Sequence, residues 1–209
     1  MADLLLTAVE ARVIASLSEK SITTPNYYPM TVNALTLASN QKSSRDPVMQ
    51  LKEGEVGSVL LDLAEKSLAQ RDDAGSRVPK WRQNFQHHLL LQPATFAVLL
   101  TLMLRGPQTQ AELRSNAVAL GGPATAEGVV AALQDLADRS QPLVVLLPRS
   151  PGQKEARHAH TLSGPPELTA APGPPAHAET PAPAGRAAIE ERLRALEERV
   201  AQLEAKNAP

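Results

Sequence analysis

The chain has 209 residues and a formal net charge of −1 at pH 7, so its overall charge favours neither nucleic acid nor a membrane surface as a partner. It contains no cysteine, which excludes disulfides, thiolate zinc sites and cysteine nucleophiles. The N-terminal sequence lacks the basic and apolar regions of a secretory signal, and no apolar run is long enough to span a membrane, so we expect a cytoplasmic protein.

The first half of the chain has the pattern of three helices followed by a hairpin. Helices are predicted over residues 4–18, 29–40 and 51–66, and two strands over residues 68–85. Thr7 and Glu10 form a capping-box pattern at the start of the first helix. Residues 21–25, rich in Ser, Thr and Pro, predict that this helix ends in a turn or an extended segment.

The same order of elements is predicted again in the second half. The helices fall at residues 91–104, 109–120 and 125–139, and the strands at residues 143–147 and 154–162. Residues 62–67 and 135–140 are similar in sequence, and Gly75 aligns with Gly152 in the two hairpin turns. A repeat of about eighty residues indicates tandem domains, because each unit is long enough to close a core. The sequence therefore predicts a mainly α fold with small β-hairpins (α+β), in two tandem winged-helix domains at residues 1–86 and 87–163.

Two further segments follow the repeats. Residues 164–185 are rich in Pro and Ala, a composition that predicts a disordered linker. Residues 186–206 carry apolar side chains at alternating spacings of four and three residues, which is the pattern of a parallel coiled coil and predicts a homodimer. The residues expected at the dimer contact are Ile189, Leu193, Leu196, Val200 and Leu203. The alternative is an amphipathic helix that packs on its own chain, since isolated helices of this length are marginal.

Two sets of short motifs stand out in residues 4–164. They are EARVI at 10–14, NQKS at 40–43 and RDPV at 45–48, then LRGPQT at 104–109 and PGQKE at 151–155. Together they resemble the signatures of the YceH family of uncharacterised bacterial proteins. The resemblance implies tandem winged-helix domains and no assigned activity. Ser39 stands where the family pattern has cysteine, which argues against a redox role there, and residues after 164 depart from the pattern as a lineage-specific addition.

The third helix of each predicted domain does not have the composition of a DNA-reading helix. Such a helix needs Arg, Lys, Asn or Gln at its exposed positions, and carboxylates there are repelled by phosphate. The positions expected to be exposed are Lys52, Glu53, Glu55, Ser58, Asp62 and Glu65 in the first domain, and Glu127, Gln134, Asp135 and Asp138 in the second. We therefore expect neither third helix to read bases.

Candidate residues for binding nucleic acid or a partner lie instead in the stretch 19–48 and in the two hairpins. They are Tyr27, Tyr28, Asn40, Gln41, Lys42, Arg45, Arg77, Lys80, Arg82, Lys154 and Arg157. Basic hairpins can hold phosphate without reading bases. Hairpin charges also serve to protect sheet edges from aggregation, and Asn40 equally fits a structural role at a helix C-terminus, so both alternatives remain open.

The sequence contains no glycine-rich phosphate loop and no nucleophile motif. His158 and His160 could share a strand face, but no nearby carboxylate other than Glu155 supplies a third metal ligand. We expect no enzyme and no catalytic, cofactor or metal site. The first functional hypothesis is a DNA-associated regulator that contacts duplex backbone through its wings, which rests on analogy with other tandem winged helices. The alternative is a protein–protein interaction module that docks through the acidic third helices and residues 19–48, which the placement of charge favours.

Overall fold

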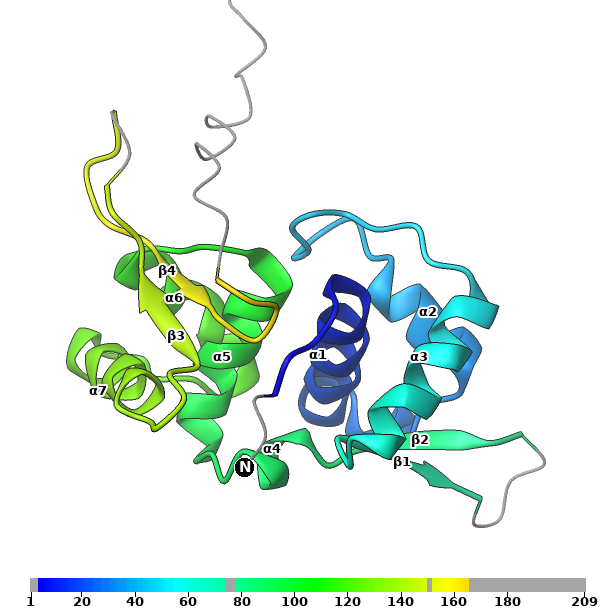
Figure 1. Ribbon diagram of the computed structural model, residues 1–209. Helices are drawn as coiled ribbons and strands as arrows, with labels where there is room; N and C mark the ends of the chain where they lie inside the picture. Colours follow the sequence, from blue (N-terminus) through cyan, green and yellow to red (C-terminus); the bar gives the residue numbers. More distant parts are fainter. Residues whose placement is uncertain (1–3, 74–77, 150–151, 166–209) are drawn as a thin grey trace, which may run out of the picture. The chain divides into compact units, whose positions relative to one another are not determined.

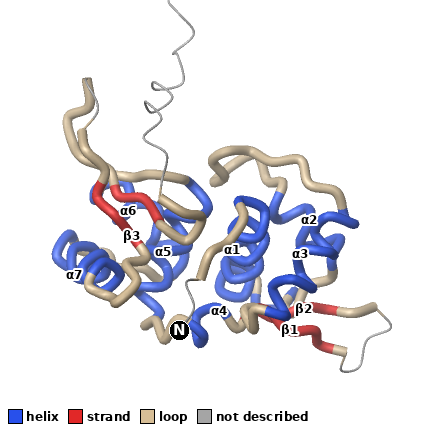
Figure 2. Tube along the Cα trace, viewed as in Figure 1, coloured by secondary structure: helices blue, strands red, loops and turns tan. Residues whose placement is uncertain are grey.

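A computed structural model describes residues 4–73, 78–149 and 152–165. The fold is α+β, with helices and two small antiparallel sheets (Figure 1, Figure 2). The predicted coiled coil at residues 186–206 lies outside the described residues, as does the predicted linker apart from residues 164 and 165.

The first half contains the predicted order of elements. These are α1 (Ala8–Thr23), η1 (Pro25–Tyr27), α2 (Val32–Ser39), α3 (Glu53–Glu65), β1 (Ala69–Asp72) and β2 (Lys80–Gln83). The two strands are antiparallel, with Gln70 opposite Arg82. On the other edge of β2, Trp81 and Met30 exchange two backbone hydrogen bonds, so the stretch before α2 adds to the small sheet.

The second half repeats this order. Its elements are α4 (Phe85–His88), α5 (Pro93–Arg105), α6 (Gln110–Ala117), η2 (Val118–Leu120), α7 (Ala126–Ala137), β3 (Val144–Leu146) and β4 (His158–His160). The strands are again antiparallel, and Gln108 bridges to His158 as Met30 bridges to Trp81. The predicted helices and hairpins of both halves are thus present, and the short helix α4 was not predicted.

The start of α1 agrees with its sequence and its end does not. Thr7 Oγ1 accepts a hydrogen bond from Glu10 N while the Glu10 carboxylate accepts one from Thr7 N, so the predicted capping box is confirmed. The helix continues to Thr23 instead of ending near residue 18. The hydroxyls of Ser21 and Thr23 donate to backbone carbonyls three and four residues earlier, so the helix backbone supplies the acceptors for these side chains.

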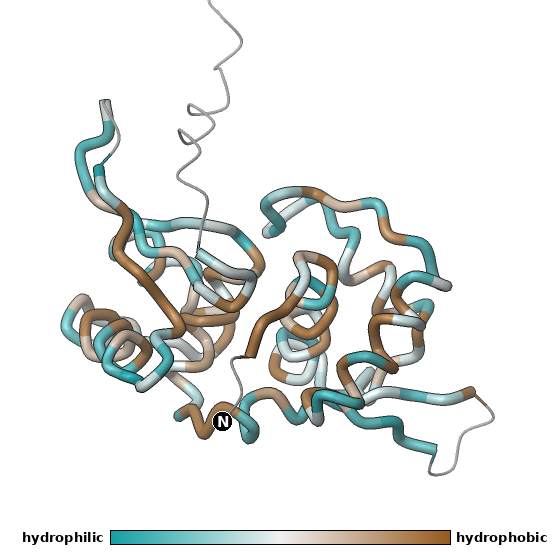
Figure 3. Tube along the Cα trace, in the orientation of Figure 1, coloured by the Kyte–Doolittle hydropathy of each residue, from teal (hydrophilic) through white to brown (hydrophobic). Residues whose placement is uncertain are grey.

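Helix α1 of the first half packs against helices of both halves. Every residue from Glu10 to Glu19 is buried, and α1 contacts α2 and α3 as well as α5 (Figure 1). Helix α5 is buried from Thr95 to Leu104, and parts of α1, α5 and β3 are strongly hydrophobic (Figure 3). Phe85 and Phe96 add an edge-to-face aromatic contact with ring centroids 5.7 Å apart. The two repeats therefore share a continuous core within one compact unit that holds all the described residues.

No helix in the described part of the chain combines the length and hydrophobicity needed to cross a membrane.

Candidate functional site

The loop of residues 40–48, which follows α2, is tied to both halves of the protein. Asp46 N donates to Leu104 O at 2.8 Å, and Arg105 Nη2 donates to Ser44 Oγ at 2.7 Å. Both second-half partners lie at the C-terminal end of α5, so this loop connects the repeats at a second place beyond the α1–α5 contact.

Arg45 anchors this loop through buried contacts with α1 and α2. Its side chain has no exposed surface, and its Nη2 lies 2.6 Å from Glu19 Oε2 and 2.9 Å from Ala38 O. Since the guanidinium is enclosed by these acceptors, it has no donor available to an incoming phosphate. Arg45 is therefore not part of the exposed basic surface that the sequence suggested, and its role is structural.

Arg12 supports the same loop from α1. It is buried, and its guanidinium donates to Pro47 O at 2.8 Å and to Ser39 O at 3.4 Å. Burial lowers the pKa of Arg12 and the positive charge of Arg45 lowers it further, whereas Asp46 and Glu19 act in the opposite direction. Two buried guanidinium groups thus fix the path of the loop against α1.

The neighbouring polar residues divide into structural and exposed groups. Asn40 Nδ2 donates to Leu51 O and Asn40 Oδ1 accepts from Leu51 N, both at 2.8 Å. These bonds match the structural role weighed for Asn40. Lys42 is exposed and Gln41 is partly exposed, so these two residues remain candidates for contact with a partner.

The two tyrosines have different environments. Tyr27 is 81% exposed. Tyr28 is partly buried, its hydroxyl accepts from Gln83 N at 2.6 Å, and Arg82 Cζ lies 5.8 Å from its ring centroid. Burial raises the pKa of Tyr28, although the hydrogen bond from Gln83 and the charge of Arg82 oppose this shift. Tyr28 therefore fastens the stretch after α1 to β2, and Tyr27 is the tyrosine available at the surface.

The first hairpin neutralises much of its own positive charge. Arg71 Nε lies 2.7 Å from Asp73 Oδ1, and Arg82 Nε lies 2.5 Å from Asp72 Oδ2. Lys80 is partly exposed, and Arg77 lies outside the described residues. Paired arginines attract phosphate less than free ones, because the carboxylate offsets their charge.

The second hairpin has exposed cations near its turn. Arg157 makes a bidentate ion pair with Glu112, with Nη1 2.9 Å from Oε2 and Nη2 3.1 Å from Oε1, and it also donates to Pro107 O. Lys154 and Arg149 are exposed on either side of the turn. Sequence analysis did not single out Arg149, although a cation directly before the turn motif is a signal for it.

The outer faces of the third helices are acidic, as predicted. All ten positions expected to face solvent on α3 and α7 are exposed. Leu61 of α3 is 58% exposed among these charges, and Leu37 of α2 is 67% exposed. Sequence analysis missed both leucines, which stand out as apolar residues on the polar side of each helical pattern.

Comparison with known proteins places this arrangement in a family. A family described as "Protein of unknown function, DUF480" matches residues 6–153. A UPF0502 protein of Geobacter sulfurreducens is 48% identical over 168 residues, covering 80% of this chain and 77% of the relative. One from Delftia acidovorans is 44% identical over 207 residues, covering 97% of this chain and 89% of the relative. One from an Acidovorax strain is 45% identical over 208 residues, with coverage of 96% and 90%.

The last two matches extend well beyond residue 165, so the C-terminal region is not confined to this chain. The predicted lineage-specific addition is therefore shared by at least these relatives. The match over residues 6–153 and the identities of these relatives agree with the motifs at residues 10–48 and 104–155. The chain belongs to the DUF480, or UPF0502, family of bacterial proteins of unknown function, which is the YceH family.

Proposed function

We propose that this chain is a non-enzymatic protein of two winged-helix domains that docks a protein partner through α3, α7 and the stretch 19–48. Each half has three helices followed by a two-stranded antiparallel hairpin, which is the order of a winged helix. In each half, one residue before the second helix bridges to the hairpin: Met30 to Trp81, and Gln108 to His158. This repeated bridge supports the winged-helix assignment.

The observation that carries the docking proposal is the outer face of α3. It exposes Glu53, Glu55, Asp62 and Glu65, and Leu61 on the same helix is also exposed. Phosphate is repelled by such a face, whereas a protein segment with lysine or arginine beside an apolar side chain is complementary to it. Tyr27 adds an exposed aromatic side chain of the kind that dominates protein interfaces.

Charge reversal on α3 tests this proposal. The wild-type chain, Asp62→Lys and the control Glu155→Lys are each used to capture proteins from a bacterial extract. Both variants change the net charge equally, and both positions are exposed. A basic partner should be enriched by the wild type and the control and lost with Asp62→Lys. If no protein is enriched, or if all three chains capture the same set, the docking proposal is rejected.

Contact with duplex DNA backbone is the second candidate, supported by the exposed cations Arg149 and Lys154 of the second hairpin. Fluorescence titration with random duplex DNA at two salt concentrations measures it directly, because phosphate contacts weaken as salt rises. The double variant Arg149→Ala with Lys154→Ala should reduce any such binding and its salt dependence. Lack of salt-sensitive binding at micromolar protein excludes this candidate.

A further inference from the structure

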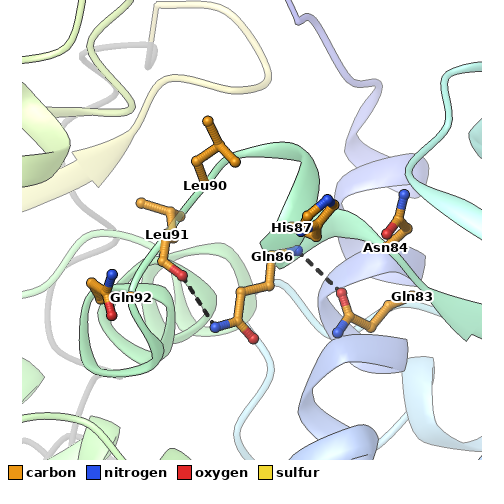
Figure 4. A pocket seen from close by; sticks show the side chains of 7 residues that line it. All are labelled: Gln83, Asn84, Gln86, His87, Leu90, Leu91 and Gln92. Carbon is orange, nitrogen blue, oxygen red and sulfur yellow. Dashed lines mark hydrogen bonds between the residues drawn. The ribbon is translucent and has the colours of Figure 1, made fainter.

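A second candidate site lies where the two repeats are joined. A pocket of about 410 Å³ is formed by the end of β2, α4 and the residues that lead into α5 (Figure 4). It involves no residue of α3 or α7, so it is separate from the proposed docking faces. The residues that line it are Gln83, Asn84, Gln86, His87, Leu90, Leu91 and Gln92.

The lining is strongly polar but carries no Asp, Glu, Lys or Arg. Four carboxamides and one imidazole provide hydrogen-bonding groups, and two leucines provide apolar surface. An ionic ligand would lose hydration here without meeting an opposite charge. An uncharged ligand with several donors and acceptors suits the lining better.

The existing hydrogen bonds leave both donors and acceptors in the pocket. Gln83 Oε1 accepts from Gln86 N, and Gln86 Nε2 donates to Leu91 O, each at 3.1 Å (Figure 4). Asn84 Nδ2 donates to Ser67 O at 3.2 Å. These bonds fix the orientation of the three amides. They leave Gln83 Nε2 as a donor and the side-chain oxygens of Gln86 and Asn84 as acceptors, with no partner among the described residues.

The backbone conformation of Leu90 is a second, independent indication of a binding site. Its φ is 51°, in the left-handed region, at the C-terminal end of α4. Leu90 N donates to His87 O and Leu91 N donates to Gln86 O, which is the pattern of a helix end where glycine is usually preferred. Here the residue is a leucine, which lines the pocket and is 71% exposed. Unfavourable backbone conformations of this kind cluster at ligand sites.

We propose that this pocket binds a single unpaired nucleobase. Asn and Gln side chains form paired hydrogen bonds with base edges, and an imidazole or an exposed apolar side chain can cover a base face. The base has two sources that share this chemistry, a free nucleoside and an unpaired position in a single strand. A duplex keeps its base faces stacked and its pairing edges occupied, and an inorganic anion has no base edge.

Nuclear magnetic resonance titration of the full chain tests the proposal. The probes are adenosine, guanosine, cytidine and uridine, a single-stranded tetranucleotide of mixed sequence, and a duplex. At least one nucleoside or the tetranucleotide should shift the side-chain amide signals of Gln83, Gln86 and Gln92 saturably. Binding of nucleosides identifies the free ligand, and binding of the tetranucleotide alone identifies a base within a strand.

Two variants assign the binding to the pocket. Gln92 makes no side-chain capping bond to α5, so Gln92→Ala leaves the described hydrogen bonds intact. It should weaken binding about tenfold, as expected for loss of one paired contact. Leu90→Gly keeps the backbone conformation and removes the side chain, and it should also weaken binding. The control Gln134→Ala removes an exposed amide on α7 and should leave binding unchanged.

Three outcomes overturn the proposal. The first is the lack of saturable shifts with every nucleoside and with the tetranucleotide. The second is binding that Gln92→Ala and Leu90→Gly do not change. The third is binding of the duplex alone, with shifts centred on the hairpins, which would indicate contact with phosphates and leave the pocket without a base. None of these outcomes depends on whether α3 docks a protein.

Discussion

Arg45 and Glu19 are 26 residues apart in the sequence, yet Arg45 Nη2 lies 2.6 Å from Glu19 Oε2 in the interior. The Arg45 side chain has no exposed surface and that of Glu19 is 12% exposed. The pair therefore fixes the loop of residues 40–48 to α1. In a buried pair, the desolvation of both charges is offset only while both partners are present.

Removing one partner should consequently be costly. Arg45→Ala is expected to lower the free energy of unfolding by about 3 kcal/mol, because Glu19 loses both hydrogen bonds from Arg45 and keeps only Lys20, whose Nζ lies 3.3 Å from Glu19 Oε2. Lys42→Ala, an exposed position on the same loop, serves as the control and should change it by less than about 0.5 kcal/mol. Urea unfolding measures both. Equal midpoints for the two variants would contradict a stabilising role for the pair.

The tyrosines offer a matched comparison. Tyr28→Phe removes the acceptor of the Gln83 N–H and should destabilise the chain by about 1–3 kcal/mol. Tyr27→Phe removes the same atom from an exposed ring and should have almost no effect. Thermal unfolding of both variants separates the two roles. The assignment fails if Tyr27→Phe is the more harmful change.

His160 predicts how stability responds to acid. Burial lowers its pKa from 6.5 to about 4, so the folded chain keeps this imidazole neutral where the unfolded chain protonates it. The contribution of His160 is therefore complete above pH 6.5 and is lost as the pH falls toward 4. His160→Asn should reduce the loss of stability in this window, measured by urea unfolding at several pH values. His88→Asn, at an exposed position, is the control, and equal pH profiles for both variants would refute the prediction.

Gly106 and Gly54 should respond to alanine with opposite signs. Gly106 has a φ of 71°, and a Cβ there would lie 3.4 Å from Asp46 Oδ2, so Gly106→Ala should destabilise by about 1–3 kcal/mol. Gly54 lies in α3, and among the described residues no other element comes within 4 Å of the place that an alanine methyl group would take. Gly54→Ala should therefore stabilise by up to about 1 kcal/mol. Calorimetry of both variants tests this contrast, which the same sign for both would contradict.

Dimerisation is predicted from the heptad spacing of residues 186–206 alone. Sedimentation of the full chain should give a dimer, and a chain truncated at Gly185 should give a monomer. Leu196→Lys in the full chain places a charge at the predicted contact and should also give the monomer. Monomer masses for all three chains would reject the coiled coil.

The element order was accessible from sequence because it depends on local signals. The capping box at Thr7, the helical spacing of apolar residues and the hairpin turns each act over a few residues. The extension of α1 to Thr23 was missed because Ser and Thr usually favour a turn at such positions. In the structure, their hydroxyls instead donate to carbonyls of the same helix.

Whether an individual charged side chain is buried or paired could not be predicted from local sequence. Arg45 has the same sequence signature as an exposed cation, and only Glu19, on another element, shows that it is buried. The pairing of Arg82 with Asp72 depends on the register of β1 against β2. The pocket at residues 83–92 also needed the folded backbone, because α4 and the conformation of Leu90 bring its amides together.

The burial of α1 between the two repeats limits which substitutions the chain can accept. Helix α1 is buried from Glu10 to Glu19 between elements of both repeats, so substitutions along it perturb packing against one repeat or the other. Backbone amides of α1 should exchange with solvent only when the whole unit opens, and they should be the slowest in hydrogen exchange together with those of α5. Because α1 of one repeat packs against α5 of the other, a change in either helix has to be accommodated by its counterpart.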